Sequence, residues 1–169
     1  RFIAYPDNLP TANAFFQDVP TDNFARNAVT LMQIANEFLP FVLDVIAQEK
    51  PDFIIHDSLA AWGKLAARIT GLPAVCLVST FVLDGKFAAQ VMPIKTQLMM
   101  LPQVLSVLPA FFRERGVVRR QHRVKPLGLM DPLMAMEDAN IVFTSLEFQP
   151  NGQRYRDTCR FVGPMIDKH

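Results

Sequence analysis

The stretch Pro51–Thr80, PDFIIHDSLAAWGKLAARITGLPAVCLVST, decides the fold. Phe53–Ile55 is too short an apolar run for a helix and follows a turn-forming Pro-Asp pair, so it predicts a strand covered on both faces. Ala74–Val78 predicts a second buried strand. Between them, apolar residues recur at helical spacing until Gly71 and Pro73 supply a stop. A strand, a helix and a strand in this order predict an α/β fold with a parallel sheet.

Polar residues follow both predicted strands, and parallel sheets place their functional loops at the carboxyl ends of strands. Asp57 follows the first strand, where a carboxylate can hold and polarise a neighbouring imidazole. Asp57 or Ser58 can equally cap the helix that follows. Ser79 and Thr80 end the second strand, so their hydroxyls could line the same cleft or bond the local backbone. Both interpretations stay open for each residue.

Other polar residues are weaker candidates for a site. His56 should point to the side opposite Asp57 if the strand alternation holds, and we interpret it as a core or turn histidine. His122 lies in an arginine-rich stretch and is interpreted as a surface residue. Glu147 and Gln149 are interpreted as local capping groups rather than an acid/base pair.

The segment before this unit predicts a strand and a long helix. The strand is Phe2–Tyr5. Apolar residues then recur in steps of four and three from Phe24 to Val45, which indicates one face of a helix. Pro40 lacks a backbone donor inside this pattern, so we expect the helix to bend or split near Glu37–Pro40.

The segment after the unit predicts short helices and two more strands. Phe81–Phe112 is apolar, rich in methionine and interrupted by three prolines. Because methionine adapts to variable apolar ligands, these short helices could wall a small-molecule pocket or form ordinary core. Arg113–Lys125 predicts a solvated loop or helix end. Asn140–Thr144 and Arg160–Val162 predict strands, and Pro150 can open a helix.

The composition limits the class of protein. With 169 residues, 50% of them hydrophobic and 20% charged, the chain predicts one globular domain. The net charge of +1 and the lack of a basic stripe interleaved with aromatics argue against a nucleic-acid partner. Neither a glycine-rich phosphate loop nor a GxSxG or HExxH motif occurs, so no motif supports nucleotide binding, a hydrolase or a metal site.

Membrane and redox signals are weak. The longest uncharged stretch, Thr96–Phe112, is shorter than the ~20 apolar residues that span a bilayer. With its basic flank it could still form a membrane-surface element, which we keep as an alternative. Cys76 and Cys159 lack metal-site spacing and fit a reducing compartment, so we expect a cytoplasmic protein. No signal peptide precedes the strand-like start at Arg1, and we expect further residues upstream.

Three stretches carry a resemblance to a known family. They are Pro51–Thr80, the segment ANIVFTSLEFQP that begins at Ala139, and the later FVGP. Together they resemble the acceptor-side lobe of UDP-dependent glycosyltransferases, especially the bacterial macrolide-glycosyltransferase type. The opening FIAYP is similar to the chain entering the third strand of that lobe. The resemblance implies the GT-B fold, in which two Rossmann-like lobes face each other.

The resemblance also implies an activity and its residues. In that family the N-terminal lobe binds the acceptor, the C-terminal lobe binds the UDP-sugar as co-substrate, and no cofactor is needed. A histidine near the first strand deprotonates the acceptor hydroxyl in an inverting displacement, and an Asp orients that histidine. Asp57 matches this Asp, and Ser79 matches a hydroxyl residue near the transferred sugar. We expect binding of acceptor or donor sugar by Ser79, Thr80, Phe81, Met92 and Met99.

The chain departs from the family pattern at both ends. The first strand with its histidine would precede Arg1, the donor lobe would follow His169, and neither His56 nor His122 matches the missing base. The resemblance therefore implies that residues 1–169 are a partial acceptor-binding lobe, inactive alone. The intact protein would glycosylate a hydroxyl of a macrolide, phenolic or similar natural product. The alternative is a non-catalytic α/β module that binds a small molecule.

Overall fold

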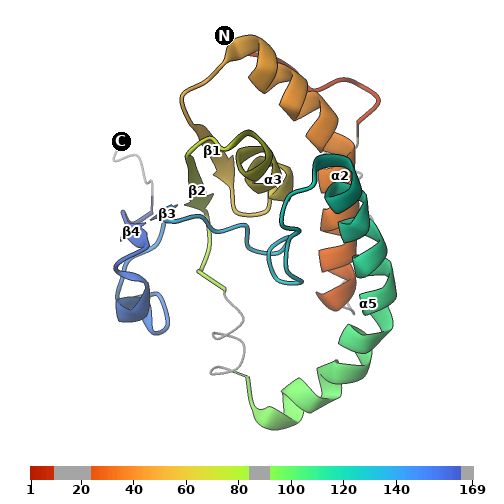
Figure 1. Cartoon of the computed structure of the whole chain (residues 1–169). Coiled ribbons are helices and arrows are strands. Elements are labelled where there is room, and N and C mark those ends of the chain that lie inside the picture. Colours follow the sequence, from red (N-terminus) through yellow and green to blue (C-terminus); the bar gives the residue numbers. More distant parts are fainter. Residues whose placement is uncertain (10–23, 84–91, 165–169) are drawn as a thin grey trace.

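The computed structural model describes residues 1–9, 24–83 and 92–164, which form one α/β unit (Figure 1). Its four strands make a single parallel sheet in the order β1-β2-β3-β4. The predicted α/β class and parallel sheet are therefore confirmed. In chain order the elements are α2 (Phe24–Glu49), β1 (Ile54–Asp57), α3 (Ala61–Thr70), β2 (Ala74–Val78), α5 (Ile94–His122), β3 (Ala139–Val142), the 3₁₀-helix η1 (Gly152–Tyr155) and β4 (Cys159–Phe161).

The register of the sheet brings the carboxyl ends of the strands to one edge. Asp57 at the end of β1 pairs with Leu77, and Val78 at the end of β2 pairs with Val142. Val142 in turn pairs with Phe161 at the end of β4. The loops that follow the strands therefore all leave the sheet on the same side.

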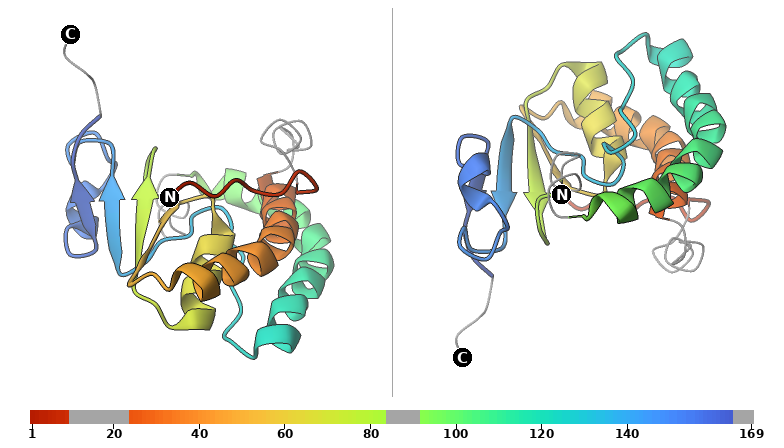
Figure 2. Two further views of the ribbon diagram at one scale, coloured as in Figure 1. Left: turned by 90° about the horizontal axis from the view of Figure 1, so that it is seen from above. Right: turned by 90° about the horizontal axis from the view of Figure 1, so that it is seen from below.

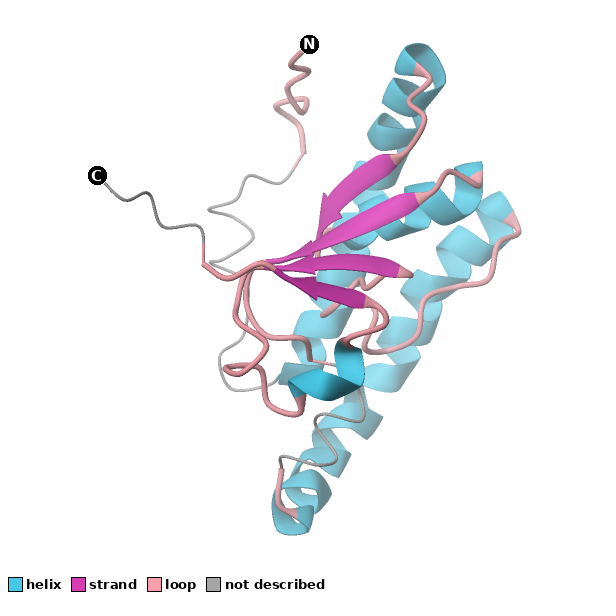
Figure 3. Ribbon diagram, turned by 90° about the vertical axis from the view of Figure 1, so that its left-hand side faces the viewer, coloured by secondary structure: helices cyan, strands magenta, loops and turns pink. Residues whose placement is uncertain are grey.

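The helices cover one face of the sheet, as Figures 2 and 3 show. Phe53 and Ile55 are each 54% exposed, so the expectation that this strand is covered on both faces is wrong for the described residues. Side chains alternate between the two faces along β1, so Ile54 packs against the helical core while Ile55 points to the opposite, exposed face. The buried core between α2, α3 and α5 includes Met32, Leu39, Leu65, Ala66, Phe111 and Val118.

The N-terminal segment is not the predicted strand. Residues 1–6 have no regular structure. Tyr5 instead packs against α2, with its ring centroid 4.8 Å from that of Phe38 and 5.5 Å from that of Phe41. Its hydroxyl accepts a hydrogen bond of 3.3 Å from the Trp62 indole N–H. Aromatic packing on two helices therefore holds this segment where the sequence pattern predicted strand pairing.

The prolines do not divide the long helices. Pro40 lies inside the continuous α2, which changes direction along its length in Figure 1 but does not split. Pro102 and Pro109 lie inside the 29-residue α5, so the predicted short helices are wrong. A proline removes one backbone hydrogen bond, and packing against a neighbouring helix can offset that cost of about 3 kcal/mol. The two helices lie along each other, and α5 curves in Figure 1.

Helix α2 is apolar and long enough to cross a membrane, by length and composition alone, over Ala25–Glu49. In the structure it lies against α3 and α5. Its apolar stripe is fully covered by these helices at Met32 and Ala35. These contacts are those of the core helix that the periodicity predicts.

The ends of the shorter elements only partly follow the prediction. Gly71 ends α3 in the left-handed conformation, with φ 73°, and its N–H donates to the Ala67 oxygen as expected of a C-cap. At the other end Ala60 occupies the N-cap without a side-chain hydrogen bond, so the proposed caps Asp57 and Ser58 are wrong. Likewise Pro150 opens no α-helix, and only the short η1 follows.

Candidate functional site

The polar residues predicted to share a cleft do lie at one edge of the sheet. The Ser58 N–H donates to the Leu77 oxygen at 2.9 Å, which places the end of β1 beside the end of β2. Ser79 and Thr80 follow two and three residues after Leu77 and are exposed, as is Asp57. One carboxylate and two hydroxyl side chains are thus available to a ligand at this edge.

Asp57 has one engaged and one free carboxylate oxygen. Its Oδ1 accepts a hydrogen bond of 2.8 Å from the Leu59 N–H, and its backbone oxygen accepts one of 3.0 Å from the Ala60 N–H. This is a local turn at the end of the strand. Within the described ranges the carboxylate has no other hydrogen bond, so its second oxygen can accept one from an imidazole or a hydroxyl group.

His56 lies behind Asp57, on the helix-covered face. Its side chain is 4% exposed, which confirms that it points away from the Asp57 carboxylate. Its Nδ1 is 2.9 Å from the Asp57 backbone oxygen, and its Nε2 is 3.1 Å from Glu137 Oε1. Lys64 Nζ donates to the Met136 oxygen and lies 3.8 Å from Glu137 Oε2. A buried cluster of His56, Lys64 and Glu137 therefore supports the end of β1.

Sequence reasoning missed Glu137 and Lys64. Glu137 lies 81 residues from His56, so no local spacing connects them. The only local signal is Lys64 itself, a charged residue surrounded by the apolar residues of α3. Such a lysine is rarely buried unless it has a partner.

Asn140 fixes the backbone of Glu137. Its Nδ2 donates to the Glu137 oxygen at 2.7 Å and to the Thr158 oxygen at 2.9 Å, while its Oδ1 accepts from the Glu137 N–H at 2.9 Å. Asn140 is buried, and all these bonds are made within the protein. The carboxylate that faces His56 is therefore attached to a rigid segment.

Gln149 pins the segment that follows Ser79 and Thr80. Its Oε1 accepts from the Val82 N–H at 2.9 Å, and its Nε2 donates to the Val82 oxygen at 3.2 Å. The interpretation of Gln149 as a merely local cap is wrong, because it spans 67 residues to reach Val82. Phe81, half-buried, lies 5.5 Å from the Phe148 ring, measured between centroids.

Of the two methionine candidates, Met92 lies just before α5 and Met99 lies in its second turn. Met92 and Met99 are 37% and 70% exposed. Residues 84–91, which are part of the predicted pocket wall Phe81–Phe112, lie outside the described residues. Large exposed apolar side chains accompany the methionines along α5, and these are Ile94, Leu98, Leu101 and Leu105. An apolar row of this kind can wall a pocket for an apolar ligand.

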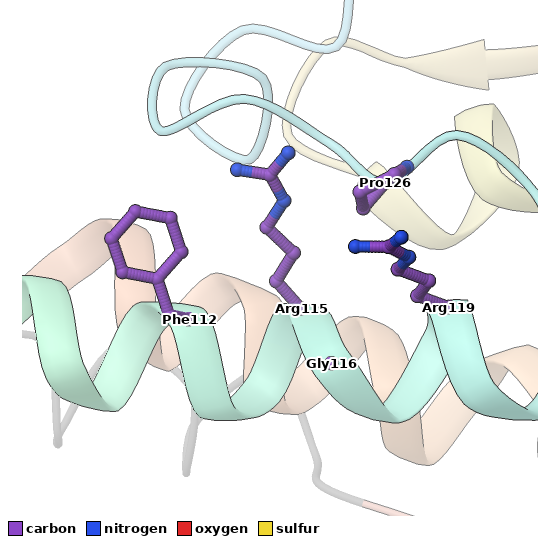
Figure 4. A pocket seen from close by; sticks show the side chains of 5 residues that line it. All are labelled: Phe112, Arg115, Gly116, Arg119 and Pro126. Atoms are coloured by element: carbon purple, nitrogen blue, oxygen red, sulfur yellow. The ribbon is translucent and has the colours of Figure 1, made fainter.

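A shallow basic pocket lies on the other half of α5 (Figure 4). It has a volume of about 240 Å³ and is lined by Phe112, Arg115, Gly116, Arg119 and Pro126. Nearby, the C-terminal part of α3 is tied to Lys125 by Arg68, which donates to the Lys125 oxygen at 2.8 Å. Helix α3 begins at the carboxyl edge of the sheet and ends toward the opposite edge, where Arg68 contacts Lys125. The pocket beside them therefore lies at the end of the lobe opposite Asp57. The residues from 113 to 122 form the end of a helix, one of the two expected forms.

The two cysteines are free and buried. Cys76 pairs with His56 across the first two strands. Burial raises the pKa of the Cys76 thiol to about 12, and the negative charges of Asp57 and Glu137 add to this effect. Burial also raises the pKa of Cys159. Both thiols are therefore poor nucleophiles in the folded protein.

The raised pKa of Cys76 predicts a loss of stability at alkaline pH. Below its ordinary value of 9.0 the thiol is protonated in both states, and between 9.0 and about 12 only the unfolded state releases the proton. The free energy of unfolding should therefore fall by up to about 1.4 kcal/mol per pH unit more than in Cys76→Ala. Urea unfolding at pH 8 and pH 10.5 measures this. Equal losses in both proteins would contradict it.

The sheet, its one-sided helical cover and its polar carboxyl edge define a Rossmann-like α/β lobe. Solved structures share this fold. The glycotransferase of kitacinnamycin matches 87% of this chain with a TM-score of 0.66 and 19% identity. The calicheamicin glycosyltransferase CalG4 matches 84% with a TM-score of 0.62 and 18% identity. The chain covers 37% and 36% of those two proteins. The fold is that of a GT-B glycosyltransferase lobe, as the resemblance implied.

Curated relatives carry the sequence resemblance. NDP-glycosyltransferase YjiC of Bacillus licheniformis is 27% identical over 132 residues, which are 78% of this chain and 30% of that protein. The uncharacterized UDP-glucosyltransferase YojK of Bacillus subtilis is 26% identical over 165 residues, 89% of this chain and 40% of the relative. No family model matches the chain. The resemblance to bacterial UDP-glycosyltransferases is confirmed, and the chain spans about a third of the length of these relatives.

Proposed function

We propose that this chain is the acceptor-binding part of an inverting glycosyltransferase that moves a sugar from a UDP-sugar to a hydroxyl group of a small apolar natural product. The observation that carries the proposal is Asp57, exposed at the carboxyl edge of the sheet with one carboxylate oxygen available. A carboxylate in this place suits the Asp that orients the catalytic histidine. The names of the sequence relatives support a nucleotide-sugar donor.

The proposed reaction needs a base that these residues do not supply. His56 is buried and faces away from the edge, and His122 is the last residue of α5, so the proposal assigns the imidazole to a strand that precedes Arg1 in the full-length protein. Asp57 would accept a hydrogen bond from that imidazole and stabilise it as it takes the acceptor proton. The acceptor oxygen then attacks the anomeric carbon, and the bond from that carbon to the diphosphate breaks, so that UDP leaves with the electron pair.

The remaining candidates would bind the reactants. Ser79 would approach the transferred sugar from the edge that it shares with Asp57, and Thr80 and Phe81 follow it on the segment that Gln149 pins. Met92 and Met99 would contact an apolar acceptor such as a macrolide or a phenolic compound. Because the thioether side chain of methionine is flexible, it can adapt to apolar ligands of different shapes.

We also propose that residues 1–169 act within a longer cytoplasmic protein. The chain covers between 30% and 40% of its curated relatives, and the donor-binding half would lie beyond it. The UDP-sugar would be a co-substrate held mainly by that second lobe. Free, buried cysteines suit the reducing cytoplasm.

Assays with the full-length gene product and with residues 1–169 alone test the proposal. Each protein is incubated with UDP-glucose and a panel of macrolide and phenolic acceptors, and products are measured by mass spectrometry. We expect glycosylated product from the full-length protein and none from residues 1–169. Turnover by residues 1–169 alone would contradict the proposal that sugar transfer needs a donor-binding lobe outside these residues. Acceptor binding without turnover by the full-length protein, over a panel of UDP-sugars, would favour a non-catalytic binding module.

A further inference from the structure

The buried cluster of His56, Lys64 and Glu137 has no part in the proposed chemistry. All three side chains are covered, with exposed fractions of 4%, 10% and 18%. Burying charged groups costs free energy unless they are paired and hydrogen-bonded. A cluster of this kind directly behind Asp57 therefore calls for a role.

Both ring nitrogens of His56 face oxygen atoms that can only accept hydrogen bonds. Nδ1 faces the backbone oxygen of Asp57 at 2.9 Å, and Nε2 faces the Glu137 carboxylate at 3.1 Å. An imidazole N–H donates to acceptors of this kind, and a hydrogen bond to a carboxylate is stronger than one between neutral groups. His56 thus connects the Asp57 peptide to Glu137.

The other contacts leave His56 and Glu137 little freedom. A Cβ atom on Gly63 would lie 2.5 Å from the His56 Cβ, so α3 packs directly onto the ring side of β1. Glu137 is fixed through its backbone by Asn140 and approached by Lys64. The segment that carries Glu137 also holds Ser58, the residue after Asp57, because the Ala135 N–H donates to the Ser58 oxygen at 2.7 Å.

We propose that His56 and Glu137 are positioning residues, which clamp the Asp57 peptide from the buried side and so fix the direction of its carboxylate. The backbone oxygen and the side chain of Asp57 share one Cα, so holding the peptide plane limits the direction of the Cα–Cβ bond, and the Leu59 N–H then holds the carboxylate itself. This inference rests on the proposed role of Asp57 and adds a supporting layer to it. Small errors in such an orientation lower catalytic rates strongly.

The variant Glu137→Gln in the full-length protein tests the clamp. Glutamine keeps the shape of the side chain but replaces the carboxylate by a neutral amide, so its hydrogen bond to His56 Nε2 is weaker than the bond to Glu137. We expect kcat to fall about tenfold while KM for the UDP-sugar stays within about twofold. Glu137→Asp, which keeps the charge but shortens the reach, should recover only part of the rate.

Glu114→Gln is the matched control. Glu114 is a carboxylate of similar burial, 15% exposed, which bonds Asn36 and Gln33 of α2 and pairs with Arg113. Glu114→Gln should change the free energy of unfolding about as much as Glu137→Gln does, but leave kcat unchanged. An equal loss of kcat in both variants would reduce Glu137 to a general stabilising residue and overturn the proposal.

Hydrogen exchange separates this proposal from the proposed function. The Leu59 amide donates to Asp57 Oδ1, so its exchange rate reports the Asp57 turn directly. Glu137→Gln should accelerate exchange at Leu59 relative to the core amides of α2, and Glu114→Gln should not. If Asp57→Asn leaves kcat unchanged, the proposed function fails, while faster Leu59 exchange still supports the clamp. If Leu59 exchange does not change, the clamp is overturned whatever Asp57 does.

Discussion

The variant Asp57→Asn of the full-length protein is expected to lower kcat by about 10²- to 10⁴-fold, with KM for the UDP-sugar changed by less than about twofold. The amide keeps the size of the carboxylate and can still accept the Leu59 N–H. It cannot stabilise a positively charged imidazole, so the cost should appear in the chemical step and not in donor binding. Steady-state kinetics with saturating donor and acceptor measures the effect.

Asp52→Asn is the control for this experiment. Asp52 is exposed near the start of β1, at the opposite end of the strand, so its loss should leave kcat unchanged. Thermal unfolding should show that both variants remain folded. If Asp57→Asn and Asp52→Asn have the same wild-type kcat, Asp57 is only a turn residue and the proposed mechanism must be abandoned.

Two glycines inside helices should respond to alanine in opposite ways. Gly63→Ala would place its Cβ 2.5 Å from the His56 Cβ and 2.7 Å from the His56 Cγ, and both are held by the buried cluster. Overpacking of this kind costs about 1–3 kcal/mol. At Gly116 of α5 the nearest atom is Arg120 Nη1 at 3.5 Å, an ordinary contact. Gly116→Ala should therefore stabilise the protein by about 0.5–1 kcal/mol, since alanine favours the helix.

Urea unfolding of the two alanine variants beside the wild type measures this difference in sign. Because Gly63→Ala also presses on the clamp, it should speed exchange of the Leu59 amide, whereas Gly116→Ala should leave that amide unaffected. A Gly63→Ala variant as stable as the wild type would show that α3 can move away from β1 at little cost. The rigid support inferred for His56 would then be wrong.

The sequence was a good guide to the part of the fold built from local patterns. The unit from Phe53 to Val78 was predicted from a short apolar run, a helical period and Gly71 at the stop. The shared edge of Asp57 and Ser79 followed from the parallel order alone, because parallel strands end on the same side. The direction of His56 also followed, since side chains alternate along a strand.

Several of the errors share one physical origin, which is packing between residues far apart in the chain. Pro40, Pro102 and Pro109 disfavour helix locally, yet the long contact between α2 and α5 outweighs them. Phe2–Tyr5 has strand-like composition, but Tyr5 finds aromatic partners on the helices instead. Other partnerships are invisible in the sequence because their members are separated by many residues, as for His56 with Glu137 and Gln149 with Val82.

The exposed apolar row at the start of α5 has a consequence for the evolution of the protein. Leu98, Met99 and Leu105 are each more than half exposed, so their replacement removes few core contacts. Substitutions at such positions usually change stability by no more than about 0.5 kcal/mol. The rigid half of α5, around Phe111, meanwhile stays anchored on α2. Under the proposed function, in which this row contacts the acceptor, new acceptor preferences would be acquired, in nature or in a mutant library, by varying this row while the sheet and Asp57 stay as they are.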